Sequence, residues 1–147
     1  MVRSKRRRKK SSIREYIESA HNQIHNCPSV RIFDQEPHST VSSDGIIGKI
    51  VASALLNSGV TVDVVEEVTI RPGPRTYEAV PGVYVQRHSY TVWEPDGVKF
   101  VAFDYSPAGH PAMPHHKHRH GSATHLQALG PHDPRNLRAL CKYLKSR

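Results

Sequence analysis

The chain is poor in large apolar side chains. Its 147 residues include one tryptophan, three phenylalanines and two methionines, and hydrophobic residues make up 37% of the total. We therefore expect a modest core with polar extensions. No apolar run approaches the roughly 18 residues that a membrane-spanning helix needs, and no apolar segment follows the basic start as it would in a secretory signal. These absences predict a protein that makes no use of a membrane.

Cysteine is also scarce. Cys27 and Cys141 are far apart in the sequence and form no C-x-x-C pair. This pattern argues against a disulfide framework and against a thiolate zinc site, and it makes a reducing cytoplasm the expected location. The six tyrosines and the single tryptophan form no aromatic stripe of the kind that recognised RNA-binding folds carry.

Acidic residues are absent from the first ten positions, which contain seven of the 21 lysines and arginines. Without this segment the formal net charge falls from +8 to +1. We predict that residues 1–10 form a disordered basic arm and that residues 11–147 form a single α+β domain. The arm would bind nucleic-acid phosphates in a salt-dependent, sequence-independent manner, and the alternatives are a nuclear localisation signal or a solubilising tail. Its candidate contacts are Arg6, Arg7, Arg8, Lys9 and Lys10.

Two helices are predicted, one near each end of the chain. Ser12 and Glu15 form an S-x-x-E capping box before a helix over residues 12–26. Asp133-Pro134 would supply the N-cap and the first residue of a C-terminal helix. The apolar residues that recur at helical spacing are Ile13, Ile17, Ala20 and Ile24 in the first helix and Leu137, Leu140, Cys141 and Leu144 in the second.

Alternating apolar residues predict four strands in sequential hairpins, over residues 46–56, 60–70, 83–93 and 98–105. Asn57-Ser58-Gly59 and Pro95-Asp96-Gly97 are the turn signals between paired strands. A helix over residues 46–57 is the alternative for the first of them. Residues 29–43 are expected to be a connection and residues 106–132 mainly a loop. The predicted fold is therefore a four-stranded antiparallel β-meander with an N-terminal helix, a His-rich loop and a C-terminal helix.

Histidine is concentrated in one segment, with seven of the 11 between positions 110 and 132. Two imidazoles can share proton-donor and proton-acceptor roles near neutral pH, as cleavage of RNA by its own 2′-hydroxyl requires. We take His116 and His118 as this pair and His110 as a third candidate. Lys117 and Arg119 would stabilise phosphate charge, and Asp104 would orient an imidazole.

Metal binding is the second interpretation of the same segment. His116, His118 and His120 alternate, so in an extended chain they project to one side. Three imidazoles could hold Zn²⁺ and leave one position open. The third interpretation is a flexible loop of solvated histidines.

The stretch from Tyr90 to His120 resembles the TumE-like family of small bacterial and archaeal toxins. The matching pieces are the Asp96-Gly97 turn, the Phe103-Asp104 strand end, an early His110 and the motif Pro114-His115-His116-Lys117-His118. The preceding hairpin also fits, with Gly45-Ile46 at its start and Glu66 or Glu67 late in its second strand. The chain departs from the family pattern at Thr91, Ala102, Phe103 and Tyr105, and Arg87 or Arg119 is the candidate to replace the arginine missing at Ala102.

The resemblance implies that the chain is the toxin of a toxin–antitoxin system and that it acts on nucleic acid, with RNA favoured over DNA as the target. Its partner would be a DNA-binding antitoxin. Together with the histidine segment, it predicts a metal-independent endoribonuclease in the cytoplasm, without a cofactor. A homodimer is left open. The alternatives are a non-catalytic nucleic-acid-binding protein and a zinc-dependent hydrolase.

Overall fold

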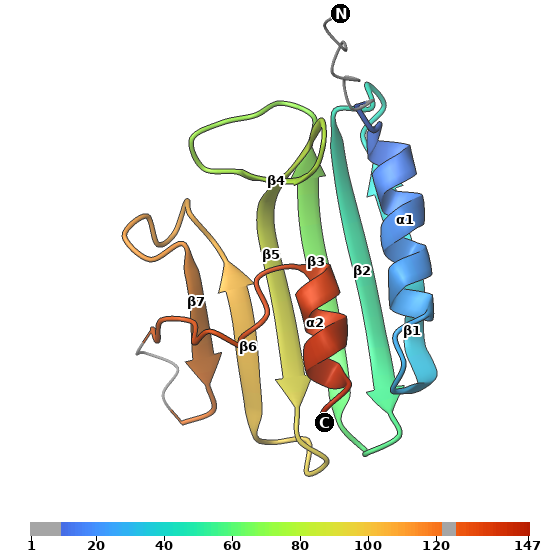
Figure 1. Cartoon of the computed structure of the whole chain (residues 1–147), viewed down its shortest axis with the longest axis vertical. Helices are drawn as coiled ribbons and strands as arrows, with labels where there is room; N and C mark the ends of the chain where they lie inside the picture. Colours follow the sequence, from blue (N-terminus) through green and yellow to red (C-terminus); the bar gives the residue numbers. More distant parts are fainter. Residues whose placement is uncertain (1–9, 122–125) are drawn as a thin grey trace, which may run out of the picture.

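The computed structural model describes residues 10–121 and 126–147. Its elements are, in order, α1 (Ile13–His25), β1 (Val30–Val41), β2 (Ile47–Leu56), β3 (Thr61–Thr69), β4 (Tyr77–Val80), β5 (Val83–Trp93), β6 (Phe100–Tyr105), β7 (His115–Arg119) and α2 (Leu137–Leu144). All seven strands form one antiparallel sheet in the order β1-β2-β3-β5-β6-β7, and β4 pairs with β5. Both helices lie on the same face of this sheet (Figure 1).

The predicted four-stranded meander is therefore wrong. The four predicted strands correspond to β2, β3, β5 and β6, which do pair in sequence order. Three further strands extend this sheet: β1 and β7 at its two edges, and the short β4 beside the start of β5. The class remains α+β.

Strand β1 lies in the segment that the sequence predicts to be a connection. The prediction missed it because apolar and polar residues do not alternate there. It pairs with β2 through three register shifts, the last of which spans Pro37. Proline cannot donate to a β-ladder and is tolerated at an edge, and each shift interrupts the period of two on which the sequence prediction depends. An irregular edge strand therefore leaves no periodic signal.

Strand β7 lies in the segment that the sequence predicts to be loop. Its own sequence, HHKHR, contains no apolar or β-branched residue. The ladder with β6 holds it from one side, and on the other side Lys117 exchanges two backbone hydrogen bonds with Gln127. Backbone pairing therefore makes this strand, without help from intrinsic propensity.

The helices follow the predicted apolar spacing. Helix α1 begins with the capping box, in which the Glu15 backbone N–H donates to Ser12 Oγ at 3.1 Å and the Ser12 N–H donates to the Glu15 carboxylate. Helix α2 starts later than expected, because Asn136 is its N-cap and Asp133 instead binds Lys117 and the Gly130 N–H. Neither described helix is long and apolar enough to cross a membrane.

The hydrophobic core lies between the helices and the sheet. On β6, Phe103 and Tyr105 are buried in this core, and Phe103 packs edge-to-face on Tyr143 of α2 with 5.2 Å between ring centroids. Because successive side chains of a strand point to opposite faces, Asp104 lies on the face away from the helices. That face carries the candidate site.

Candidate functional site

The pairing of β6 with β7 brings a carboxylate and two imidazoles together. Asp104 lies opposite His116 in the ladder, and Ala102 lies opposite His118. The Oδ2 atom of Asp104 is 3.5 Å from Nε2 of His118 and 3.9 Å from Nε2 of His116. One atom from each of the three residues falls within 4.8 Å of the other two.

The loop between β6 and β7 adds a third imidazole. The ring centroid of His110 is 4.7 Å from that of His116 and 6.4 Å from that of His118. The His110 N–H donates to the Ser106 carbonyl, and the Met113 N–H donates to the His110 carbonyl, so the loop closes on itself through backbone bonds. All four residues predicted to be catalytic therefore meet in one cluster, which we call the Asp104 cluster: Asp104, His110, His116 and His118.

The Met113 carbonyl determines the orientation of His116. It lies 3.0 Å from Nδ1 of His116, and because a carbonyl only accepts, Nδ1 carries the proton. In the neutral ring, Nε2 then presents a lone pair toward Asp104. The Oδ1 atom of Asp104 is buried and has no hydrogen-bond partner among the described residues.

Burial separates the roles that the imidazoles can take. His116 is 1% exposed, so it cannot reach a large substrate. The side chain of His118 is 22% exposed and that of Asp104 is 19% exposed, and His110 is half-buried. The accessible pair is therefore His118 with His110.

His120 does not join the two histidines with which it was predicted to bind a metal. Strand β7 ends at Arg119, and the His120 ring packs against Phe100 with 5.9 Å between centroids. The carboxylate of Asp104 takes the place that the sequence interpretation assigns to His120.

The predicted phosphate-binding residues are distributed over several places. Lys117 is bound to Asp133, with 2.8 Å between Nζ and Oδ2, so its charge is already compensated. Arg87 pairs with Glu67 at 3.0 Å. Lys10 is exposed. The other arm residues, Arg6, Arg7, Arg8 and Lys9, lie outside the described residues, as does His125 of the histidine segment.

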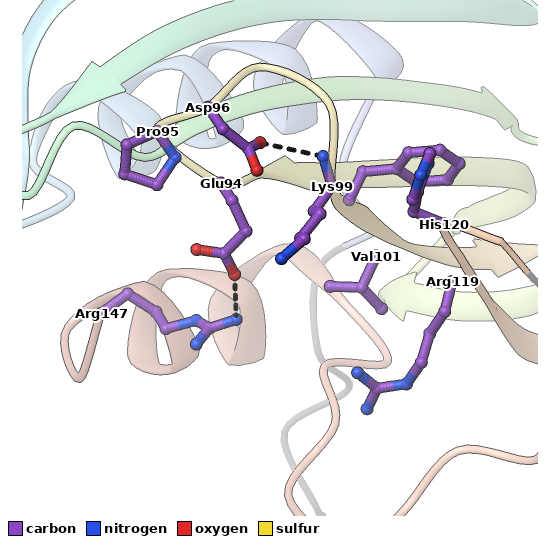
Figure 2. A pocket seen from close by; sticks show the side chains of 9 residues that line it. Glu94, Pro95, Asp96, Lys99, Val101, Arg119, His120 and Arg147 are labelled. Carbon is purple, nitrogen blue, oxygen red and sulfur yellow. Dashed lines mark hydrogen bonds and ion pairs between the residues drawn. The ribbon is translucent and has the colours of Figure 1, made fainter.

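Arg119 lines a groove that sequence reasoning missed. The groove lies where the β5–β6 turn, the end of β7 and the C-terminus of the chain meet, and the side chains of Lys99, Arg119 and Arg147 border it (Figure 2). Asp96 and Glu94 also line it. We call this the basic groove.

The two acidic side chains of the basic groove, Asp96 and Glu94, both have partners within the protein. Backbone N–H groups of Val98 and Lys99 donate to Asp96 at 2.8 and 3.0 Å, and these bonds lower the pKa of Asp96. Glu94 faces Arg147 at 3.5 Å (Figure 2). No carboxylate in the described part of the chain forms an ion pair with the Lys99 ammonium, so the groove has spare positive charge for an anion.

A second polar cluster is buried on the helix side of the sheet. Glu66 is 1% exposed, and it accepts hydrogen bonds from the hydroxyls of Tyr16 on α1 and Tyr90 on β5, the latter at 2.8 Å. Burial raises the pKa of Glu66, and the two tyrosine hydrogen bonds oppose that shift. Glu66 thus ties the first helix to the centre of the sheet.

His88 lies next to this carboxylate and is equally buried. Its ring stacks on Tyr90 at 4.2 Å, and Nδ1 is 2.9 Å from the Tyr77 hydroxyl. Burial, followed by the positive charges that His115 and His116 could carry, lowers the pKa of His88 to about 3. The sequence did not reveal that His88 is buried, because a histidine in an alternating strand gives the same pattern whether its side chain is buried or exposed.

No protein-family model, curated protein or solved structure matches this chain. The resemblance to the TumE-like toxins therefore stays a prediction, and the functional conclusions depend on the geometry of the two clusters and the groove.

Proposed function

We propose that this protein is a toxin-like endoribonuclease that cleaves RNA by general acid–base catalysis in the Asp104 cluster. The observation that supports it best is the arrangement of Asp104, His118 and His110. A carboxylate lies 3.5 Å from one accessible imidazole, and a second accessible imidazole lies nearby. Catalysis by the RNA's own 2′-hydroxyl needs one group to take a proton and another to give one.

His118 is the proposed base. The negative charge of Asp104 favours a proton on the Nε2 atom that faces it, which leaves the lone pair on Nδ1 for the 2′-hydroxyl proton. His110 is the proposed acid that protonates the leaving 5′-oxygen. With 6.4 Å between the two ring centroids, a phosphate bound across the exposed edges of both rings could contact both. Buried His116 is a positioning residue, since it contacts both rings.

The basic groove supports RNA as the substrate. Arg119 follows His118 along β7 but points to the opposite, helix-bearing face of the sheet, and it lines the groove together with His120. An RNA strand whose scissile phosphate lies at His118 would reach Lys99, Arg119 and Arg147 by passing around the end of β7. Phe100 also lines the groove, and a base can stack on an aromatic ring without regard to sequence.

Replacing His118 by alanine is expected to slow RNA cleavage at least 100-fold, because positioned proton transfer contributes about that much or more. His110→Ala should have a similar effect. The assay is the cleavage of a fluorescent single-stranded RNA by purified protein, with circular dichroism to verify the fold. His132, an exposed residue outside the cluster, gives the matched control His132→Ala, which should cleave normally.

Unchanged cleavage in His118→Ala would refute the assignment of the base. A wild-type protein that binds RNA but leaves it intact after long incubation would instead support the non-catalytic nucleic-acid-binding alternative.

Removing two cations from the basic groove should weaken RNA binding. We expect Lys99→Gln with Arg147→Gln to lower affinity about tenfold and to reduce the salt slope by about 0.7 for each phosphate that is no longer neutralised. Fluorescence anisotropy with a single-stranded RNA measures both, and the His118→Ala background prevents cleavage. Arg14→Gln with Arg31→Gln removes the same charge from exposed sites on α1 and β1. If this control weakens binding equally, the groove has no special role.

The proposal also implies a partner, because a ribonuclease toxin must be neutralised in the cell that makes it. We propose a DNA-binding antitoxin for this role and the cytoplasm as the place of action. A gene for a small DNA-binding protein next to the gene for this chain would support both.

A further inference from the structure

We propose that Asp104, His116 and His118 bind a divalent transition-metal ion, with zinc as the probe, and that the bound ion silences the ribonuclease. The metal-site part depends only on the geometry of the three side chains. The inhibitory part rests on the proposed function, because it assumes that His118 is the base.

The three donor atoms are close to the arrangement that zinc needs. Zinc lies about 2.0 Å from nitrogen and oxygen ligands, so two ligands of a tetrahedral ion are about 3.3 Å apart. In the described structure Oδ2 of Asp104 is 3.5 and 3.9 Å from the two Nε2 atoms, and one donor atom from each of the three residues lies within 4.8 Å of the other two. Small rotations of partly exposed His118 and Asp104 would complete the contraction.

The surroundings of His116 also suit a metal ligand. Histidines that bind metals usually donate their other ring N–H to a carbonyl or carboxylate, which fixes the tautomer and the ring orientation. The Met113 carbonyl accepts from Nδ1 of His116 at 3.0 Å, so in the neutral ring Nε2 keeps its lone pair toward Asp104. His116 is 1% exposed, so its ring has little freedom to turn away.

One oxygen of the Asp104 carboxylate lacks the donor that a buried polar atom normally has. Oδ1 is buried without a hydrogen-bond partner among the described residues, and Oδ2 lies 3.9 Å from Nε2 of His116. When the His116 ring is neutral with its proton on Nδ1, Oδ2 and Nε2 are two acceptors that gain from facing each other only if a positive charge lies between them. A metal ion supplies that charge, and imidazole with carboxylate is a donor set that zinc accepts.

A metal at this position would block the proposed reaction. Once Nε2 of His118 binds the ion, the ring proton moves to Nδ1, and the nitrogen that should accept the 2′-hydroxyl proton no longer has a lone pair. Asp104 would also be engaged by the ion. The fourth metal position would be taken by water or by His110, which would remove the proposed acid too.

Calorimetric titration of the full chain with zinc chloride tests the site without RNA. We expect one ion per chain, with affinity reduced at least tenfold in Asp104→Asn and in His118→Ala and unchanged in His132→Ala. Metal binding displaces protons from imidazole nitrogens, so the measured heat of zinc binding should vary with the ionisation enthalpy of the buffer. Far-ultraviolet circular dichroism shows whether each variant is folded. Absence of binding, or equal binding by all four proteins, would overturn the metal site.

Cleavage assays test the inhibitory part. We expect stoichiometric zinc to stop cleavage of single-stranded RNA by the wild type and a chelator to restore it fully. Cleavage that appears only when zinc is added would overturn the inhibition and favour a zinc-dependent hydrolase. If zinc binds with the expected variant pattern but RNA stays intact both with zinc and with chelator, the proposed function fails and the metal site stands.

Discussion

Replacing Glu66 by alanine is expected to lower the free energy of unfolding by about 3 kcal/mol. The change leaves the hydroxyls of Tyr16 and Tyr90 without their acceptor, and Tyr90 is 0% exposed. An unpaired buried hydroxyl costs about 1–3 kcal/mol, and the cavity left by the side chain adds to that cost. Part of the loss is offset, because the burial of the carboxyl that raises its pKa is itself unfavourable.

Urea unfolding followed by far-ultraviolet circular dichroism measures this effect. Glu66→Gln keeps the size and one acceptor oxygen, and its amide can donate to a tyrosine oxygen, so we expect a loss below about 1 kcal/mol. Glu67→Ala is the matched control, because the neighbouring Glu67 forms a surface ion pair with Arg87, and such pairs contribute about 0–1 kcal/mol. If Glu66→Ala and Glu67→Ala were equally stable, Glu66 would not link α1 to the sheet.

His88 should make the fold sensitive to acid. The unfolded chain binds a proton at this ring with a pKa of 6.5, whereas the folded state resists protonation to about 3. Within that window the unfolded state binds more protons, so the contribution of His88 to stability is complete above pH 6.5 and is lost as the pH falls toward 3. The shift corresponds to a loss on the order of 5 kcal/mol.

Other groups around His88 also titrate, so the test compares how steeply the urea midpoint depends on pH in the wild type and in a His88 variant. The neighbouring titratable side chains are His115, His116, Tyr77, Tyr90, Tyr105 and, across the β3–β5 ladder, Glu66. The raised pKa of Glu66 acts in the opposite direction, because its protonation favours the folded state. Urea midpoints between pH 7 and pH 4 should fall more steeply for the wild type than for His88→Phe. His132→Phe should retain the wild-type slope, and parallel slopes for the wild type and His88→Phe would contradict the prediction.

The regular parts of the fold could be predicted because they leave a periodic signal. The alternating valines of β3 and the turn at Asn57-Ser58-Gly59 identify the β2–β3 hairpin, and the Ser12–Glu15 box marks the start of α1. The edge strands β1 and β7 could not be predicted in the same way. Bulges interrupt the first, and the second is made of polar residues that are paired through their backbone.

The candidate site was only partly visible in the sequence. The density of histidine indicated the segment, and Asp104 was a natural partner at the end of a strand. The exclusion of His120, the burial of His116 and the Lys117–Asp133 ion pair all depend on the register of β7 against β6 and on the chain that covers it. Cys27 and Cys141 illustrate the same point, since they are far apart in sequence but line one apolar pocket.

The local features of this protein can be read from its amino-acid sequence alone: the capped first helix, the central hairpins, the basic start and the concentration of imidazoles in one segment. Each depends on residues within a few positions of one another, so spacing is enough to reveal it. The three-dimensional fold is needed to show which histidines face Asp104, which are buried away from solvent and which cations could bind an anion. Those outcomes depend on strand register and on burial, which are produced by contacts between distant parts of the chain.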